Sequence, residues 1–345
     1  MHPRHEHFPG RADKIQIQAD CNASRFWRQV ALLPSPVSSQ ELLFSTTAAL
    51  QTAVSSLGLA PDLILLAYVH MDRTRSDYSL QVITSVALKK GSPLHISYTP
   101  PFFSLLARRN ILQRGKQFLC QCQRCTDPQE LGARLSSLKC QDCGSGFLSV
   151  SNSSHLSSAW QCNSCSASLS HEEYASTDAA LLRIQSRMDK EDVAGMKELL
   201  TSHQPSLHPH HALLTETKQH LAAALGRAEG YRWDQISESD LRLKIAISEE
   251  LLQLCNILEP GLSKCRGITL LDLAEARGRL LHKTKSGSGL LEGLLQVEKE
   301  AEEADTILKL EDEASIEGNV AKMAREQVAQ VRMAVRALKS QIPQR

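Results

Sequence analysis

Cys140-Gln141-Asp142-Cys143 and Cys162-Asn163-Ser164-Cys165 are two short stretches around which the middle of this chain is organised. Together they read Cys-x2-Cys-x18-Cys-x2-Cys. A Cys-x2-Cys pair places two thiolates on one tight turn, and two such turns close a tetrahedral Zn²⁺ site. All four ligands are cysteine, which favours a structural metal over a catalytic one, because no position is open to water. The alternatives are two disulfides or four unrelated buried thiols.

A second cluster, Cys120-x-Cys122-x2-Cys125, lies just upstream. Three cysteines within six residues indicate metal binding, but a structural zinc normally has four ligands. The candidates for the fourth ligand are Cys21, Cys255 and Cys265, or a histidine. The alternative is an incomplete or lost site.

Composition limits the function classes. A chain of 345 residues can hold two or three domains, and its net charge of +1 gives no electrostatic reason to expect nucleic-acid or membrane binding. The longest apolar run, Leu63 to Val69, is too short to cross a bilayer and is typical of a buried strand. The first seven residues do not resemble a signal peptide. Ten cysteines, seven of them in metal-type spacing, predict a reducing compartment, either cytosol or nucleus.

The composition and hydrophobic patterning of the sequence predict an α+β protein in three parts. Residues 1–118 have β-type patterning towards their end, at 80–86 and 94–98, with a turn signal at Lys90-Gly91-Ser92. Residues 119–170 form a cysteine-rich module too small to fold without its metal. Residues 171–345 carry the period of amphipathic helices.

Several helices are predicted in this last part. One is expected to begin at the cap residues Ser176-Thr177-Asp178, one to follow Pro209 and end at Gly226, and one to run from Ser239 to Pro260-Gly261. Further helices are predicted near 263–282, 289–309 and 315–341. Their lengths and short connections indicate antiparallel hairpins stacked as an α-solenoid, although no clean repeat signature is present.

The chain resembles the SET and MYND domain-containing (SMYD) lysine methyltransferases, in their arthropod SmydA-like branch, over roughly residues 78 to 340. The first part resembles the end of a SET domain and its post-SET zinc segment, through Lys90-Gly91, Ile96-Ser97-Tyr98-Thr99, Arg108-Arg109, Lys116, Phe118, the Cys120 cluster, Asp127-Pro128 and Glu130-Leu131-Gly132. The Cys140 and Cys162 pairs, with Ser136–Lys139 and Trp160-Gln161, are similar to the arthropod branch. Leu207-His208-Pro209-x-His211, Glu259–Ser263 and Arg266-Gly267 resemble the family's TPR-like helical domain.

This resemblance implies transfer of a methyl group from S-adenosylmethionine to a protein lysine, histone or otherwise, through a narrow channel that aligns the amine with the sulfonium methyl. Tyr98 matches by position the tyrosine that shapes this channel. Taken alone, Tyr98 is more simply a tyrosine at a strand end that caps the core.

The chain also departs from the family pattern. The family's Asn-His-Ser-Cys-x-Pro-Asn cofactor motif aligns with 56–62, where Ser56 and Leu57 replace the Asn and His, and Leu59 replaces the Cys that would be the fourth post-SET zinc ligand. The family's cofactor site also includes an early Gly-x-Gly segment, and Gly-Ser-Gly occurs twice in this chain. The copy at 144–146 is interpreted as part of a zinc knuckle and the copy at 287–289 as an inter-helix loop, so neither is expected to be the cofactor segment. A MYND finger needs about eight Cys/His ligands, and Cys21 is the only cysteine before Cys120, so no MYND finger is expected in this sequence. The front of the chain is therefore expected to be truncated or replaced.

Two functions remain open at this point. The first is a SAM-dependent protein-lysine methyltransferase, expected to be impaired in this form. The second is a non-catalytic, zinc-stabilised scaffold whose helical solenoid binds protein partners.

Overall fold

The computed structural model describes residues 67–71, 80–89, 96–155, 157–311 and 316–341. The chain divides into two compact units, 1–96 and 97–345. In the first unit, β1 (Ala67–Met71) pairs antiparallel with β2 (Leu80–Thr84), with Ala67 opposite Thr84. These strands confirm part of the pattern predicted at 63–69 and 80–86. The turn at 90–92 and the motif at 56–62 lie outside the described residues, and Ser97 and Tyr98 are not in a strand.

The second unit begins with helical segments around the first cysteine cluster. Helix α3 (Leu105–Lys116) is capped by Ser104, whose hydroxyl accepts from the Ala107 amide at 3.3 Å. It ends where Gln117 adopts φ 59°. A short helix α4 (Gln123–Thr126) and a 3-10 turn η1 (Glu130–Gly132) follow.

The second cysteine cluster belongs to a four-stranded antiparallel sheet. Its strands, in spatial order, are β3 (Leu138–Lys139), β4 (Phe147–Val150), β5 (Trp160–Cys162) and β6 (Ser168–Leu169). The sheet is held against the helices by Trp160, whose indole stacks on the ring of Tyr174 with centroids 3.4 Å apart. Both side chains are only 1% exposed.

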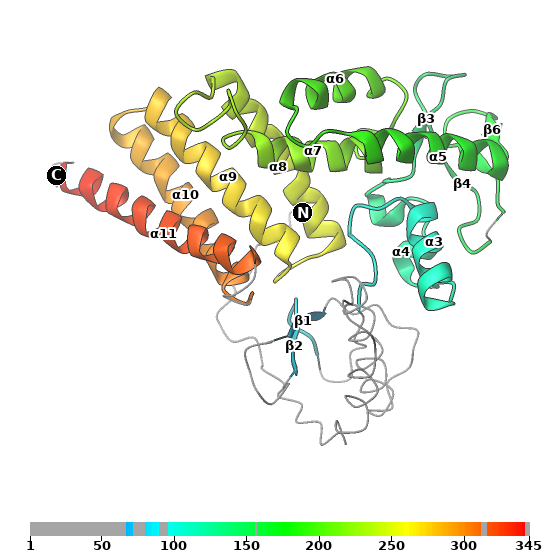
Figure 1. Cartoon of the computed structure of the whole chain (residues 1–345), viewed down its shortest axis with the longest axis horizontal. Helices are drawn as coiled ribbons and strands as arrows, with labels where there is room; N and C mark the ends of the chain where they lie inside the picture. Colours follow the sequence, from blue (N-terminus) through cyan, green and yellow to red (C-terminus); the bar gives the residue numbers. More distant parts are fainter. Residues whose placement is uncertain (1–66, 72–79, 90–95, 156, 312–315, 342–345) are drawn as a thin grey trace, which may run out of the picture. The chain divides into compact units, whose positions relative to one another are not determined.

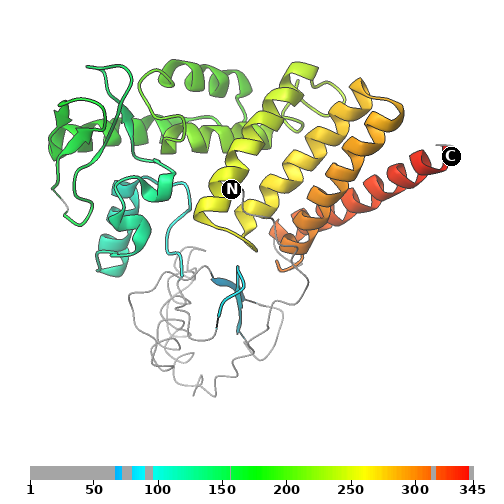
Figure 2. The ribbon, with the colours of Figure 1, turned by 180° about the vertical axis from the view of Figure 1, so that it is seen from behind.

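Seven helices make up the rest of the described chain (Figure 1). They are α5 (His171–Arg187), α6 (Val193–His203), α7 (Ala212–Ala224), α8 (Glu238–Leu258), α9 (Lys264–Thr284), α10 (Gly287–Leu308) and α11 (Ile316–Gln341). The views from both sides show α8 to α11 next to one another in chain order (Figures 1 and 2). This confirms the helical character predicted for 171–345 and the approximate bounds of the last four helices.

Three details of the helix prediction were wrong. Helix α5 begins one and a half turns before Ser176, because Ser170 and Glu173 form a reciprocal capping box. Helix α6 was not predicted. The glycines at 287–289 belong to the first turn of α10 and not to a loop.

The sheet and the helices are joined through the backbone. Leu138 of β3 forms a bridge with Leu207, the Lys139 amide donates to the Ser206 carbonyl at 3.0 Å, and the His208 amide donates to Ser137 at 3.1 Å. The segment 206–208 therefore extends the edge of the sheet. Shortly afterwards His211 caps α7: its Nδ1 accepts from the Leu213 amide at 3.3 Å, and the residue is buried.

Candidate metal centres

The four-cysteine cluster is assembled by the small sheet. Cys140 directly follows β3 and Cys162 ends β5, while Cys143 and Cys165 lie on the turns that come next. The four sulfur atoms all lie within 4.8 Å of one another. The Sγ atoms of Cys140 and Cys165 are 3.7 Å apart, and those of Cys143 and Cys162 are 3.8 Å apart.

These separations fit a tetrahedral zinc centre. With Zn–S bonds of about 2.3 Å, the edge of a regular tetrahedron of sulfurs is about 3.8 Å. A disulfide would need about 2.05 Å between two sulfurs, and all four cysteines are free thiols. The structure therefore does not support two disulfides, and its donor set matches what Zn²⁺ accepts.

Backbone amides around the cluster favour the thiolate form of its cysteines. The Gly146 amide donates to the Cys143 sulfur, and the Ser164 amide to the Cys162 sulfur, each at 3.3 Å. Hydrogen bonds from the Gly146 and Ser145 amides lower the pKa of Cys143 to about 6. Since zinc binds thiolate, these amides prepare the site for metal.

Gly146 has a second, steric role. A Cβ atom at this position would lie 2.5 Å from the Cys162 sulfur. A glycine is therefore required if the two knuckles are to meet. The sequence placed Gly146 in a knuckle turn, but this close approach is visible only once the sheet is folded.

The three-cysteine cluster is built on α4. Cys122 caps this helix, and its sulfur accepts from the Cys125 amide at 3.4 Å. The sulfurs of Cys120, Cys122 and Cys125 lie within 4.8 Å of one another. Hydrogen bonds with the other two thiols, together with the Arg108 guanidinium, lower the pKa of Cys125. The cluster thus presents three donors of the type that zinc prefers.

The proposed fourth ligands are not at this cluster in the part of the chain that the structure describes. Among those residues, no further cysteine, histidine or carboxylate joins the three cysteines. Cys255 and Cys265 contact each other instead, with sulfurs 3.5 Å apart. Cys21 lies outside the described residues.

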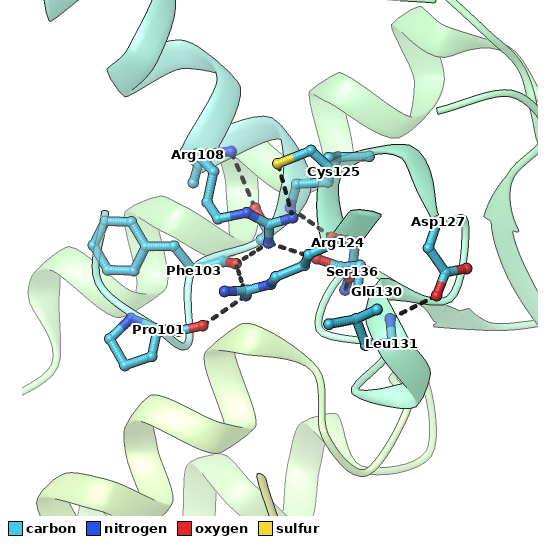
Figure 3. A network of polar contacts seen from close by, with 12 residues as sticks. Pro101, Phe103, Arg108, Arg124, Cys125, Asp127, Glu130, Leu131 and Ser136 are labelled. Carbon is cyan, nitrogen blue, oxygen red and sulfur yellow. Dashed lines mark hydrogen bonds and ion pairs between the residues drawn. The ribbon is translucent and has the colours of Figure 1, made fainter. Parts of the chain in front are cut away.

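A buried polar network lies directly beside the three-cysteine cluster (Figure 3). Arg108 donates to the Glu130 carboxylate at 2.6 Å and to the Phe103 carbonyl at 2.8 Å, and its other terminal nitrogen lies 3.9 Å from the Cys125 sulfur. Glu130 also accepts from the Ser136 amide at 2.8 Å. The sequence contained these residues, but their role was missed because nothing in their spacing indicates that they meet.

Arg124, between the cysteines of α4, extends this network. It donates to the Pro101 carbonyl at 2.6 Å, next to Phe103 (Figure 3). Burial lowers the pKa of Arg124 to about 10. The network therefore connects the segment before α3, the three-cysteine cluster and the segment just before the sheet.

Tyr98 lies at the start of the second unit and is partly buried. Its ring meets the edge of Phe118, with centroids 5.9 Å apart, and Lys116 Nζ lies 5.6 Å from the ring centroid. Burial raises the pKa of Tyr98, so its hydroxyl is a neutral donor at physiological pH. The structure thus brings Tyr98 next to the end of α3 and the approach to the three-cysteine cluster.

Comparisons with known proteins point to one group. The chain is 32% identical to the SET domain-containing protein SmydA-8, isoform B, of Drosophila melanogaster over 120 residues, 34% of this chain and 27% of that protein. It is also 32% identical to isoform A over 111 residues, 32% of this chain and 24% of that protein.

The match thus spans about a quarter of the length of these curated relatives. No protein-family model matches the chain. No described helix has the length and hydrophobicity needed to span a membrane. The two matches, together with the two cysteine clusters, relate this chain to the arthropod SmydA-like branch of the SMYD proteins.

Proposed function

We propose that this chain derives from a SAM-dependent protein-lysine N-methyltransferase of the SMYD type and is impaired in its cofactor site. The observation that carries the proposal is the match to SET domain-containing relatives, combined with a tyrosine at the expected end of the SET segment. Tyr98 is the proposed lysine-channel residue, because its neutral hydroxyl and its aromatic contact with Phe118 suit a narrow, partly apolar passage.

Zinc has a structural role in this proposal. Cys140, Cys143, Cys162 and Cys165 hold one ion, and Cys120, Cys122 and Cys125 hold a second with a fourth ligand from outside the described residues. Neither ion takes part in methyl transfer in this proposal, because a zinc site filled by four protein ligands leaves no position for substrate. S-adenosylmethionine, when bound, supplies the sulfonium methyl group. The proposed impairment rests on Ser56 and Leu57, which cannot repeat the hydrogen bonds of an Asn-His pair.

A non-catalytic scaffold is the second candidate. The run of neighbouring helices from α8 to α11 favours it, since stacked helical hairpins of the TPR-like type present extended surfaces for protein partners (Figure 1). This function needs the zinc-stabilised module and the helices but no cofactor.

Calorimetry with S-adenosylmethionine separates the two functions. The protein is the purified full chain, with its zinc content measured beforehand. Binding in the micromolar range, about −8 kcal/mol, supports the methyltransferase. A chain that is folded and zinc-loaded but binds no S-adenosylmethionine overturns the enzyme and is the result that the scaffold predicts.

If the cofactor binds, Tyr98→Phe tests the channel. This variant keeps the ring contact with Phe118 and removes only the hydroxyl. We expect unchanged S-adenosylmethionine affinity and at least tenfold slower methylation of protein lysine, about 1.4 kcal/mol in the activation barrier. Tyr231→Phe is the matched control, because Tyr231 packs on Lys197 in the helical part and should leave the rate unchanged.

A further inference from the structure

Cys255 and Cys265 form a pair of thiols that neither metal centre uses. Cys255 lies in the last turn of α8 and Cys265 in the first turn of α9, and their sulfurs are 3.5 Å apart. Both are free cysteines in the structure. Among the described residues, no third cysteine, histidine or carboxylate completes a metal site with them.

The backbone holds the two cysteines in place across a short turn. The Glu259 amide donates to the Cys255 carbonyl at 2.8 Å, and Ser263 caps α9 by accepting from the Arg266 amide at 3.2 Å. Between them, Gly261 takes φ +79°, a conformation that other residues rarely adopt. The closeness of the sulfurs is therefore built into the turn.

This pair differs from the zinc cluster in its number of donors, because only two thiols meet here among the described residues. A disulfide requires about 2.05 Å between the sulfurs, so closure from 3.5 Å needs an approach of about 1.5 Å. Rotation of the two thiol side chains about their Cα–Cβ bonds is the movement that would bring the sulfurs together. A dithiol without further donors is suited to a disulfide and not to tetrahedral zinc.

The two sulfurs differ in their access to solvent. Cys255 is 1% exposed, whereas Cys265 is partly exposed. The contact with Cys255 and burial raise the pKa of Cys265 well above that of a free thiol. Cys265 is thus the more accessible residue of the pair, and its reaction with an oxidant is slow at neutral pH because the thiolate is scarce.

We propose that Cys255 and Cys265 are a redox modification site that closes reversibly to a disulfide with a hydroperoxide as oxidant. The Cys265 thiolate attacks one oxygen of hydrogen peroxide, an S–O bond forms, the O–O bond breaks, and the other oxygen leaves as water after taking a proton. The Cys255 sulfur then attacks the Cys265 sulfur, the S–S bond forms, and the oxygen leaves with the Cys255 proton as a second water. Overall, two thiols and one peroxide give one disulfide and two waters.

The bond would fasten the end of α8 to the start of α9. A cross-link stabilises a fold mainly by restricting the unfolded chain, and here it adds to a turn that is already ordered. Oxidation is therefore expected to restrict the motion of the α8–α9 hairpin without changing its fold. In a reducing compartment the disulfide would be transient.

Peptide mapping tests the proposal directly. The zinc-loaded full chain is treated with hydrogen peroxide at pH 7 and pH 9, alkylated, and digested with trypsin. Trypsin cleaves after Lys244, Lys264 and Arg266, so the two cysteines fall on separate peptides, 245–264 and 265–266. We expect these peptides to be joined in the oxidised sample, to be separate after reduction, and to join faster at pH 9.

Two variants and a second measurement complete the test. Cys255→Ser and Cys265→Ser should both lack the joined peptide, and oxidation should raise the Tm of the wild-type chain but of neither variant. Zinc content, measured in parallel, shows whether the seven other clustered cysteines stay loaded. The proposal is overturned if wild-type protein that keeps its zinc gives sulfinic acid at Cys265, or no change at all, in place of the joined peptide.

Discussion

The Arg108 guanidinium and the Glu130 carboxylate form an ion pair at 2.6 Å from which water is almost entirely excluded. The two side chains are 3% and 2% exposed. The pair joins α3 to η1 across the three-cysteine segment, and the other oxygen of Glu130 holds the Ser136 amide just before the sheet (Figure 3). One carboxylate thus connects three elements that are separate in the sequence.

Removing the charge of Glu130 should lower the free energy of unfolding substantially. Glu130→Gln keeps the shape of the side chain but leaves Arg108 buried without its counter-ion, and breaking such a pair costs about 3–5 kcal/mol. Urea unfolding measures the loss. Glu238→Gln is the matched control, because its partner Arg242 and Glu238 itself are 60% and 51% exposed, and an exposed pair contributes less than about 1 kcal/mol. Equal losses in the two variants would contradict the prediction.

Gly146→Ala should weaken zinc binding by the four-cysteine cluster. The added methyl group would lie 2.5 Å from the Cys162 sulfur and force the two knuckles apart. Competition with a chromophoric chelator should show zinc leaving the variant at a chelator concentration at least tenfold lower, about 1.4 kcal/mol. Gly289→Ala has open space around its Cβ in α10 and should leave zinc affinity unchanged. A variant of Gly146 that holds zinc as tightly as wild type would show that the knuckles can relax.

The cysteine spacing predicted which four cysteines come together, because a cluster of this type is almost local. Each knuckle needs only a tight turn, and the sheet needs only to bring two turns together. The Arg108–Glu130 pair and the Cys255–Cys265 contact could not be predicted in the same way. They depend on how helices and turns pack, which side-chain spacing does not record.

The start of α5 is another feature that the sequence alone does not decide. Ser170 with Glu173, and Ser176 with Asp178, are both plausible cap signals in the sequence. The structure uses the first, and the second falls inside the helix, where the Thr177 hydroxyl bonds to the Glu173 carbonyl at 3.0 Å and Asp178 is buried. The stacking of Tyr174 on Trp160 adds a tertiary contact to the first turn of α5, which favours the earlier cap.

Lys244 should be essential for the stability of the helical part. Its side chain is completely buried, and its ammonium donates to the Ala222 and Leu225 carbonyls at 2.6 and 3.0 Å and to Asp272 at 2.8 Å. Lys244→Met fills similar space but leaves two buried carbonyls unpaired, at a cost of about 3 kcal/mol. Lys197→Met is the control, since Lys197 is 33% exposed in its pair with Asp240 and should cost about 1 kcal/mol or less. Thermal unfolding of the two variants measures this difference, and Lys244→Met should lower the Tm more than Lys197→Met.

Asp178 should make the protein less stable as the pH rises. Burial raises the pKa of this carboxyl to about 6, despite a hydrogen bond from the Ser104 hydroxyl at 3.2 Å. In the unfolded chain its pKa is about 3.9, so the folded protein binds the proton more tightly. The stability that this proton contributes is fully present below about pH 4 and is lost as the pH rises through 6, a difference of about 3 kcal/mol.

Asp178→Asn isolates this effect, because the amide stays neutral at every pH and can still accept from Ser104. The variant should be more stable than wild type at pH 8, and its advantage should shrink by about 1.4 kcal/mol at pH 5. Comparing the two proteins at each pH cancels groups that titrate in both, including His211, whose burial lowers its pKa to about 3 and whose effect has the opposite sign. A stability difference that does not change with pH, or a variant less stable at pH 8, would mean that Asp178 is paired in the folded chain by a group that holds it ionised.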